Sequence, residues 1–354
     1  MKHIVLFLLL ALFCPLAVVA QQAVVLKQKS LARWGIAPAN YSGITALGNG
    51  RYAVVSDKES MDGFYVFRIE QDSVTGAVLH VASEGFKGQT SALSAVQGSG
   101  QRDSEGIAYH PQRGTVFVSG EADQQILEYT LDGRPTGASL QIPQLYSNQH
   151  IVSNYGFEAL AYHPATHLFW TTTESTLPED GEAAGPAHPG AVNLLRLQAF
   201  DEDLQPCASY AYRMDVGRTK GFGRLYAYGV PELTALPDGR LLVLEREVNI
   251  SKRYLRSEVV CKLFIVNPAE GWQIDSSTNL KQLDRNKFLV KTLLARFVTK
   301  LNPLRHTLAN YEGMCLGRTL ADGRQTLLLI NDSQGRMGKG GIYLKDYLKV
   351  LILP

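Results

Sequence analysis

The residues with the clearest chemical potential are acids that flank short apolar segments. Glutamate precedes four of these segments, at Glu105, Glu158, Glu232 and Glu312. A second acid closes each related segment further along the chain, at Asp57, Glu121, Glu174, Glu245 and Asp332. Carboxylates crowded into one place repel one another, and a bound cation relieves that repulsion. Calcium is a hard cation that accepts irregular sets of oxygen ligands, so these acids predict a calcium site if the fold brings them together.

The acids belong to a sequence pattern that occurs five times. Each copy has an apolar segment, a turn rich in Gly, Pro, Asp and Arg, a second apolar segment, and then an acid. The copies are SGITALGNGRYAVVSD (42–57), EGIAYHPQRGTVFVSGE (105–121), EALAYHPATHLFWTTTE (158–174), ELTALPDGRLLVLE (232–245) and EGMCLGRTLADGRQTLLLIND (312–332). Ser42 stands where the other copies begin with Glu. Such self-similarity is typical of a repeat architecture.

Each copy is predicted to form a β-hairpin, because runs rich in Val, Leu, Ile, Tyr and Phe flank turns such as Pro237-Asp238-Gly239. A hairpin followed by outer strands is one blade of a β-propeller, which makes the chain an all-β protein. Five blades can be counted, and the longer intervals leave room for a sixth. We expect a strand near 23–27 to close the circle beside strands around 342–353.

The geometry of a hairpin predicts where the acids lie. The two ends of a hairpin lie together, so the acid that opens each copy should lie near the acid that closes it. The first strands of all blades line one channel, and the acids should therefore form a ring at one mouth of that channel. A Gly-rich basic loop at 217–228, which carries Arg218, Lys220 and Arg224, is expected to cover this mouth.

Residues 285–301 depart from the strand pattern. Their apolar side chains recur at helical spacing, which predicts one inserted helix that packs over the blades. The stripe consists of Phe288, Leu289, Leu293, Phe297 and Leu301.

The N-terminus predicts export. Residues 1–20 resemble a signal peptide, with a polar start, an apolar run over 4–12 and small residues at Val18 and Ala20. The domain then spans 21–354, in the periplasm or outside the cell. Loss of Lys2 reduces the formal net charge from +2 to +1, which gives no reason to expect nucleic acid binding. No later segment is long enough to span a membrane, and we expect a monomer. Cys207, Cys261 and Cys315 permit one disulfide or three buried thiols.

Several segments resemble the phytase-like family described as having "esterase-like activity of phytase". They are SEGIAYHP (104–111), NYGFEALAYHP (154–164), GVPELTALPDGRLLVLERE (229–247), NYEGMCLG (310–317) and DGRQTLLLINDS (322–333). The resemblance covers roughly 40–345 and implies a propeller related to calcium-dependent alkaline phytases, whose calcium ions bind substrate phosphates. It also implies hydrolysis of phosphoesters or esters. Ser42 departs from the pattern and argues against a symmetric site.

These features lead to specific role predictions. Calcium would be held by Glu105, Glu158, Glu232 and Glu312. Glu245 would act as general base, and Arg246 would clamp phosphate oxygens beside it. Further contacts to a small phosphorylated or ester substrate would come from Lys58, Arg336, Glu174 and Asp332.

Two other functions remain open. One is a non-catalytic exported binding propeller with a structural metal. The other is a metal-dependent lactonase or carboxylesterase, which needs fewer cations at its site. Arg246, Arg336 and Lys58 discriminate between these functions and a phosphoesterase: a phosphate substrate is favoured if their side chains point into the mouth.

Overall fold

The structure is a computed structural model. It describes residues 22–57, 59, 61–89, 102–152, 155–334, 338–339 and 342–354. The predicted signal peptide at 1–20 and the predicted substrate contacts Lys58 and Arg336 lie outside the described residues.

The described strands form five blades and one small hairpin. Blade 1 contains β3 (Tyr41–Gly48), β4 (Arg51–Ser56), β5 (Asp62–Gln71) and β6 (Val78–Gln89). Blade 2 contains β7 (Ser104–His110), β8 (Thr115–Gly120), β9 (Gln125–Thr130) and β10 (Pro135–Ser139). Blade 3 contains β11 (Phe157–His163), β12 (Leu168–Thr173), β13 (Leu194–Phe200) and β14 (Pro206–Arg213). Blade 4 contains β15 (Leu225–Ala235), β16 (Leu241–Ile250), β17 (Glu258–Val266) and β18 (Lys291–Lys300).

Blade 5 joins the two ends of the chain. It contains β19 (Asn310–Thr319), β20 (Gln325–Asp332), β23 (Tyr347–Ile352) and β1 (Val24–Val25), and β2 (Lys29–Ser30) also pairs with β23. Val24 lies opposite Ile352 and Val25 opposite Leu351. The predicted closure of the circle by the two termini is therefore confirmed.

The remaining elements are short. β21 (Gly338–Lys339) and β22 (Ile342–Tyr343) form the small hairpin. Single 3₁₀ turns occur at η1 (Leu31–Trp34), η2 (Gln144–Tyr146), η3 (Pro268–Glu270), η4 (Leu280–Gln282) and η5 (Arg285–Lys287). Among the residues that the structure describes, no helix is long and apolar enough to cross a membrane.

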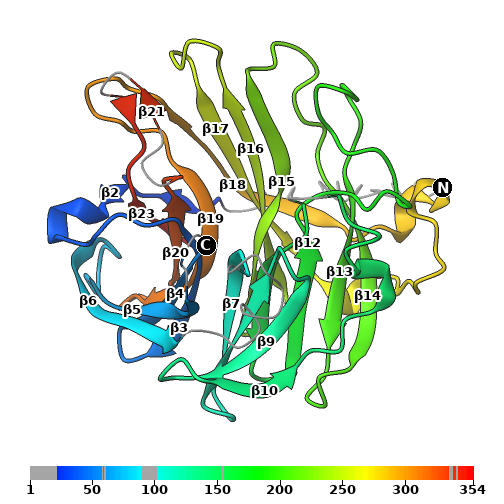
Figure 1. Cartoon of the computed structure of the whole chain (residues 1–354), viewed down its shortest axis with the longest axis horizontal. Coiled ribbons are helices and arrows are strands. Elements are labelled where there is room, and N and C mark those ends of the chain that lie inside the picture. Colours follow the sequence, from blue (N-terminus) through cyan, green and yellow to red (C-terminus); the bar gives the residue numbers. More distant parts are fainter. Residues whose placement is uncertain are drawn as a thin grey trace, which may run out of the picture.

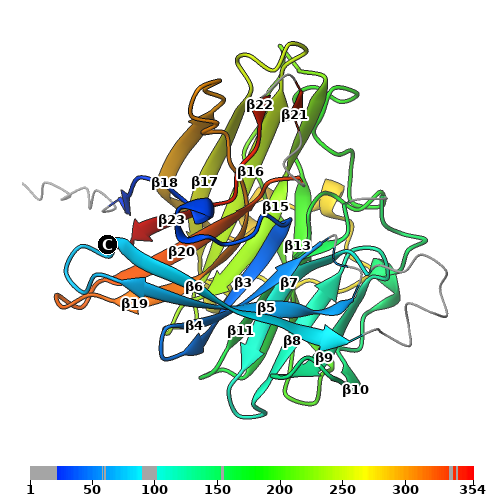
Figure 2. The same ribbon diagram turned by 60° about the vertical axis from the view of Figure 1, so that its left-hand side comes forward.

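The first strands of the blades surround one axis (Figure 1). β3 contacts β7, β7 contacts β11, β11 contacts β15, β15 contacts β19, and β19 returns to β3. The predicted all-β propeller is confirmed, and the strands that the structure describes form five blades, not six. The strands of blade 4 extend beyond the other blades on one side of the ring, which both ribbon views show (Figure 2).

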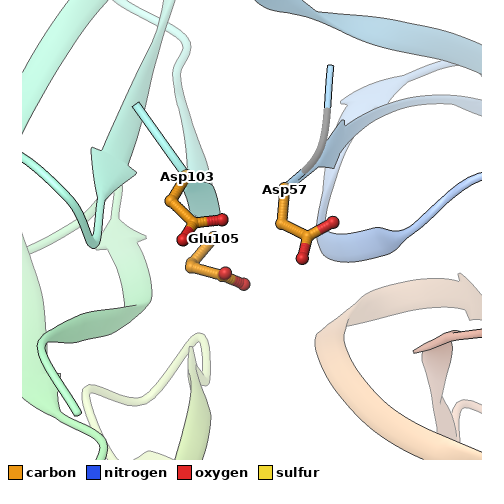
Figure 3. Close-up of side chains that lie close together, drawn as sticks. All are labelled: Asp57, Asp103 and Glu105. Carbon is orange, nitrogen blue, oxygen red and sulfur yellow. The ribbon is translucent and has the colours of Figure 1, made fainter. Parts of the chain in front are cut away.

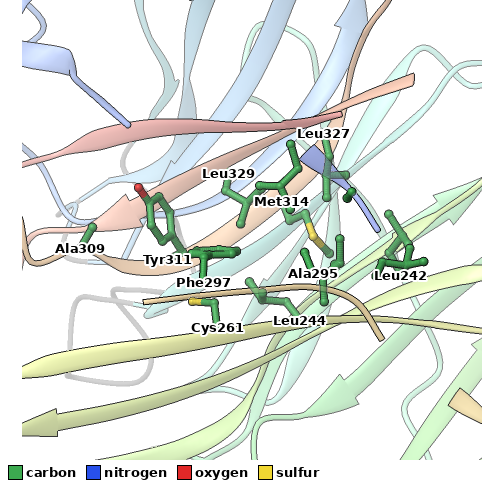
Figure 4. Packing of buried hydrophobic residues seen from close by; sticks show 14 of the residues in the cluster. Leu242, Leu244, Cys261, Ala295, Phe297, Ala309, Tyr311, Met314, Leu327 and Leu329 are labelled. Carbon is green, nitrogen blue, oxygen red and sulfur yellow. The ribbon is translucent and has the colours of Figure 1, made fainter. Parts of the chain in front are cut away.

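The strands are apolar on both faces because each blade packs against two neighbours. Between blades 4 and 5, Leu244 and Phe297 meet Met314 and Leu329 in one buried cluster (Figure 4). Each buried side chain of this size contributes about 1.5–3 kcal/mol through removal of apolar surface from water. Cys261 belongs to this cluster, and all three described cysteines are free thiols.

The prediction of a helix at 285–301 is wrong. Residues 291–300 form β18, an outer strand that pairs with β17 from Lys291↔Val266 to Lys300↔Glu258. A register shift opposite Leu263 and Phe264 inserts Leu294 as an extra residue, and this shifts the in–out alternation of the strand by one position. The shift produced an apolar spacing that resembles a helix in the sequence.

Candidate metal and active site

β-Bulges position the acids that open the repeats. Glu158 falls between the pairs Phe157↔Thr173 and Ala159↔Thr172, and so has no partner of its own across the hairpin. Glu312 falls in the same way between Tyr311↔Asn331 and Gly313↔Ile330. Glu105 lies in the corresponding shift of blade 2, between Ser104 and Ile107. A bulge redirects a side chain away from the regular pleat, and here it does so near the start of each first strand.

Glycines after three of the opening residues let neighbouring first strands approach closely. A Cβ atom on Gly106 would lie 2.3 Å from the Glu158 carbonyl oxygen, and one on Gly43 would lie 2.3 Å from the Glu105 carbonyl oxygen. A Cβ on Gly313 would lie 2.5 Å from the carbonyl oxygen of Ser42. Only glycine fits these positions. These three glycines therefore let the opening residues of adjacent blades pack closely around the axis.

The geometry favours metal binding most strongly where blades 1 and 2 meet. Asp57, Asp103 and Glu105 each offer one carboxylate oxygen, and these oxygens all lie within 4.8 Å of one another. Figure 3 shows Asp57 approaching from blade 1, opposite the other two side chains from blade 2. Such a set of hard, anionic oxygen donors fits calcium.

Asp103 was not among the residues predicted from the sequence. Its backbone adopts a left-handed conformation with φ of 56°, and its carbonyl oxygen accepts a 2.8 Å hydrogen bond from the Glu121 amide. A signal was present, because the position two residues before the opening residue is polar in three copies: Asn40, Asp103 and Asn310. Only a comparison that extended each repeat upstream could have found it.

An arginine bridges the acids of blades 3 and 5. Arg246, in the middle of β16, donates to Glu174 Oε1 at 2.5 Å and also to Glu312 Oε1. The Arg246 and Glu174 side chains are each 4% exposed. Gly229 lies opposite Arg246, and a Cβ there would come within 2.4 Å of Glu174 Cγ. Glycine at 229 therefore makes room for Glu174 to reach the arginine.

The acids act on one another electrostatically. Burial raises the pKa of Glu105, and repulsion from Glu158 and Glu312 raises it further. Burial also raises the pKa of Glu158, with repulsion from Glu174 adding to it and Arg246 opposing it. Burial raises the pKa of Glu312 to about 7 despite the opposing charge of Arg246. A bound cation would favour the ionised forms of all these groups.

Asp332 belongs to the same group. It is buried, accepts a 2.6 Å hydrogen bond from the Gln334 amide, and has a pKa raised by burial and then by repulsion from Glu312 and Asp57. Glu121 accepts a hydrogen bond from the Gly156 amide at 3.2 Å, and its charge also acts on Glu105. We call the full group the acidic mouth; its members are Asp57, Asp103, Glu105, Glu121, Glu158, Glu174, Glu312 and Asp332.

The structure places Glu232 outside the acidic mouth, which corrects its prediction as a metal ligand. It lies beyond the bulge of its hairpin, opposite Leu244 and within the regular ladder. Its Oε1 accepts hydrogen bonds from the backbone amides of Leu160 and Leu233, both at 3.0 Å. Glu232 therefore joins the first strands of blades 3 and 4.

Glu245 also lies elsewhere. Adjacent strand residues point to opposite faces, so Glu245 faces away from the side on which Arg246 meets the acids. Its carboxylate is fully buried and accepts hydrogen bonds from Tyr212 and Tyr228 at 2.8 Å and from Lys291 at 2.5 Å. Glu245 therefore does not face the water that a general base in the mouth would deprotonate, and its predicted role as that base is wrong.

The basic loop is anchored to the extended strands of blade 4. Arg218 Nη2 lies 2.6 Å from Glu258 Oε1, and the Arg218 amide donates to Glu247 at 2.9 Å. Arg224 stacks over Tyr254, with its guanidinium carbon 4.6 Å from the ring centroid. These contacts join Arg218 and Arg224 to blade 4, and the cover of the mouth by this loop stays a prediction.

Comparison with known proteins gives one family. The phytase-like family model, described as "Esterase-like activity of phytase", matches residues 38–334. No curated protein matches the chain.

Several solved structures are similar at low identity. An endo-arabinase from Bacteroides thetaiotaomicron is 9% identical with a TM-score of 0.46, and the match covers 90% of this chain and 95% of that one. A β-xylosidase/α-arabinofuranosidase from a compost microbial metagenome is 11% identical with a TM-score of 0.43, covering 94% and 95%. A streptogramin B lyase is 11% identical with a TM-score of 0.36, covering 94% and 98%.

Proposed function

The chain belongs to the phytase-like family, and from this membership and its acidic mouth we propose that it is a calcium-assisted hydrolase of phosphoesters. The observation that carries the proposal is the convergence of Asp57, Asp103 and Glu105, whose carboxylate oxygens lie within 4.8 Å of one another. Calcium takes six to eight oxygen ligands, so about three carboxylates leave positions for water and for a substrate oxygen. Calcium bound there would neutralise phosphate charge and polarise a water molecule.

Glu158 is the general base that this geometry favours. Its Oε2 atom is buried and has no hydrogen-bond partner among the described residues. Burial raises its pKa, which brings a carboxylate closer to the value at which a general base works well near neutral pH. In the proposal Glu158 takes the role that the sequence had indicated for Glu245.

Arg246 acts as a positioning residue. Its two terminal nitrogens hold Glu174 and Glu312, so they are not available to a phosphate while these contacts persist. The arginine fixes the two carboxylates and offsets part of the negative charge of the mouth. Glu174 and Asp332 would contact the substrate through calcium-bound water or through substrate hydroxyl groups.

A second candidate is a metal-dependent carboxylesterase, and one observation favours it. The arginine that points into the mouth is already paired with two carboxylates, which suits a neutral ester better than a phosphate dianion. Both candidates use the same calcium site and the same base. They differ in the charge of the group that is cleaved.

Hydrolysis assays with and without calcium test the proposal. The substrates are phytate, a simple phosphomonoester and a nitrophenyl acetate, and the variants are Asp103→Asn and the matched control Asp322→Asn, which alters an exposed turn. We expect calcium to increase phosphoester hydrolysis by the wild type, and Asp103→Asn to weaken calcium binding at least about tenfold. Hydrolysis of the acetate alone would favour the carboxylesterase. Calcium binding without hydrolysis of any substrate would favour a binding propeller.

We also propose that the chain is exported as a monomer after cleavage behind Ala20. The signal-like composition of residues 1–20 supports this step. N-terminal sequencing of the protein recovered outside the cytoplasm should begin at Gln21. A mature N-terminus at Met1 would contradict the proposal.

A further inference from the structure

A pocket of about 220 Å³ lies between blades 4 and 5, beside Arg246. Its walls are mostly apolar and include Ala227, Val248, Val259 and Leu308. Its exposed edge includes Leu225, which is 48% exposed, whereas Val259 and Leu308 are buried. An apolar cavity of about 150 Å³ is large enough to bind benzene, so this pocket can hold a ring or a short hydrocarbon chain.

Two residues at the polar end of the pocket each have one unmatched hydrogen-bonding atom. Arg246 Nε is a buried donor, and Asn310 Oδ1 is a buried acceptor, and neither has a partner among the described residues. Both residues line the pocket, and the Arg246 side chain is 4% exposed. A buried polar atom without a partner costs about 1–3 kcal/mol, so a ligand that satisfies both atoms gains affinity.

Both residues contact the same carboxylate oxygen. Arg246 Nη1 and Asn310 Nδ2 both donate to Glu312 Oε1, the latter at 2.7 Å. Because only the amide nitrogen of Asn310 can donate to a carboxylate, Oδ1 must be the atom that remains to accept. A hydroxyl group has the chemistry to match both atoms, because it can accept from an N–H donor such as Arg246 Nε and donate to an amide oxygen such as Asn310 Oδ1.

The charges around this end favour an uncharged ligand. Arg246 carries one positive charge, and Glu174 and Glu312 both contact it with their carboxylates. Arg224 also lines the pocket. With it, the charges of the two arginines and the two carboxylates sum to zero, so there is no excess positive charge for an anion. The pocket therefore suits a neutral hydroxyl group on an apolar body better than a phosphate or a carboxylate.

We propose that this pocket binds a small apolar alcohol or phenol, as the leaving group of the ester that the acidic mouth cleaves. The binding part stands alone, whereas the leaving-group part rests on the proposed function. In that hydrolysis, water adds its oxygen to the phosphorus or acyl carbon, the bond from that atom to the alcohol oxygen breaks, and the alcohol oxygen ends with a proton from water. Arg246 links the two regions, because it lines the pocket and holds two acids of the mouth.

Binding of p-cresol and toluene, measured by calorimetry without any turnover, tests the pocket. The wild type should bind p-cresol about tenfold more tightly than toluene, because the hydroxyl adds hydrogen bonds to Arg246 and Asn310. Ala227→Phe should fill the pocket and weaken both ligands at least about tenfold. Ala46→Phe is the matched control, since Ala46 is a partly exposed alanine on β3 that lines a different cavity, and it should leave binding unchanged.

Asn310→Leu provides a second test that does not depend on Ala227→Phe being folded. It should abolish the preference for p-cresol over toluene while toluene still binds. A folded wild type that binds neither ligand, or an unchanged preference in Asn310→Leu, would overturn the pocket proposal. Hydrolysis without p-cresol binding would overturn the pocket alone, and p-cresol binding without hydrolysis would support the pocket and count against the proposed function.

Discussion

Replacement of Arg246 with methionine tests whether this arginine holds the acidic mouth together. The variant keeps an apolar stem of similar length and removes the charge that contacts Glu174 and Glu312. Loss of one partner from a buried ion pair costs about 3–5 kcal/mol, because the remaining charge is left uncompensated. Two carboxylates would be left here, so we expect a loss of stability of at least about 3 kcal/mol near neutral pH.

Arg240→Met is the matched control. Arg240 Nη2 lies 2.6 Å from Asp238 Oδ2 in an exposed hairpin turn, where the two side chains are 47% and 51% exposed. Solvent screens such a pair, and its loss should cost at most about 1 kcal/mol. Urea unfolding of both variants measures the difference, provided that the dependence on urea concentration stays the same.

The pH dependence of Arg246→Met provides a further check. Arg246 opposes the raised pKa of Glu312, so without the arginine Glu312 should take up a proton more readily in the folded protein, and the variant should recover stability as the pH falls toward 5. The difference between wild type and Arg246→Met should therefore be larger at pH 8 than at pH 5. Equal, small losses in Arg246→Met and Arg240→Met at every pH would refute the reasoning.

Three other predictions concern the mouth. The pKa of Glu312 is raised from 4.5 to about 7, so its contribution to folding stability is present below about pH 4.5 and is lost as the pH rises through about 7. In thermal melts, calcium-free protein should therefore lose stability over this pH range. Millimolar calcium should reduce that loss. Glu158→Gln should lower kcat by roughly 10²–10⁴-fold while calcium still raises the melting temperature, and an unchanged kcat would exclude Glu158 as the base. Gly106→Ala should lower the free energy of unfolding by at least about 1–3 kcal/mol, because the new Cβ would meet the Glu158 carbonyl oxygen. Gly185→Ala is the control, since a Cβ at Gly185 has open space around it and should leave stability unchanged. Equal denaturation midpoints for the two variants would contradict this packing argument.

The fold could be predicted because its signal is repeated. Five hairpins with the same order of apolar segment, turn, apolar segment and acid leave few alternatives to a closed ring of blades. The closure by β1 and β23 followed from the same reasoning, since a ring of hairpins needs a partner for its last outer strand. The prediction of a helix at 285–301 was wrong because a bulge in the outer strand β18 shifts its apolar residues out of strict alternation. Pairing with β17 nevertheless makes this segment a strand.

The residues of the site were harder to predict because strand register decides which side chains meet. The fourth copy, 232–245, is shorter than the third copy, 158–174, and its bulge lies between Gly229 and Glu232. A slip of one residue moves a side chain to the other face of a strand. Alignment of the copies by their acids therefore put Glu232 and Glu245 in the mouth, whereas the ladder puts Arg246 there.

This exchange of an acid for an arginine determines where calcium should bind. If blade 4 had followed the pattern of the other copies, two more carboxylates would have entered the mouth and the charge would have been spread around the ring. Instead, Arg246 offsets the charges of Glu174 and Glu312 on its own side. The three carboxylate oxygens of Asp57, Asp103 and Glu105 are concentrated on the side of blades 1 and 2. A calcium ion should therefore bind off the propeller axis, near blades 1 and 2, and leave Arg246 and its pocket on the side from which an uncharged leaving group departs.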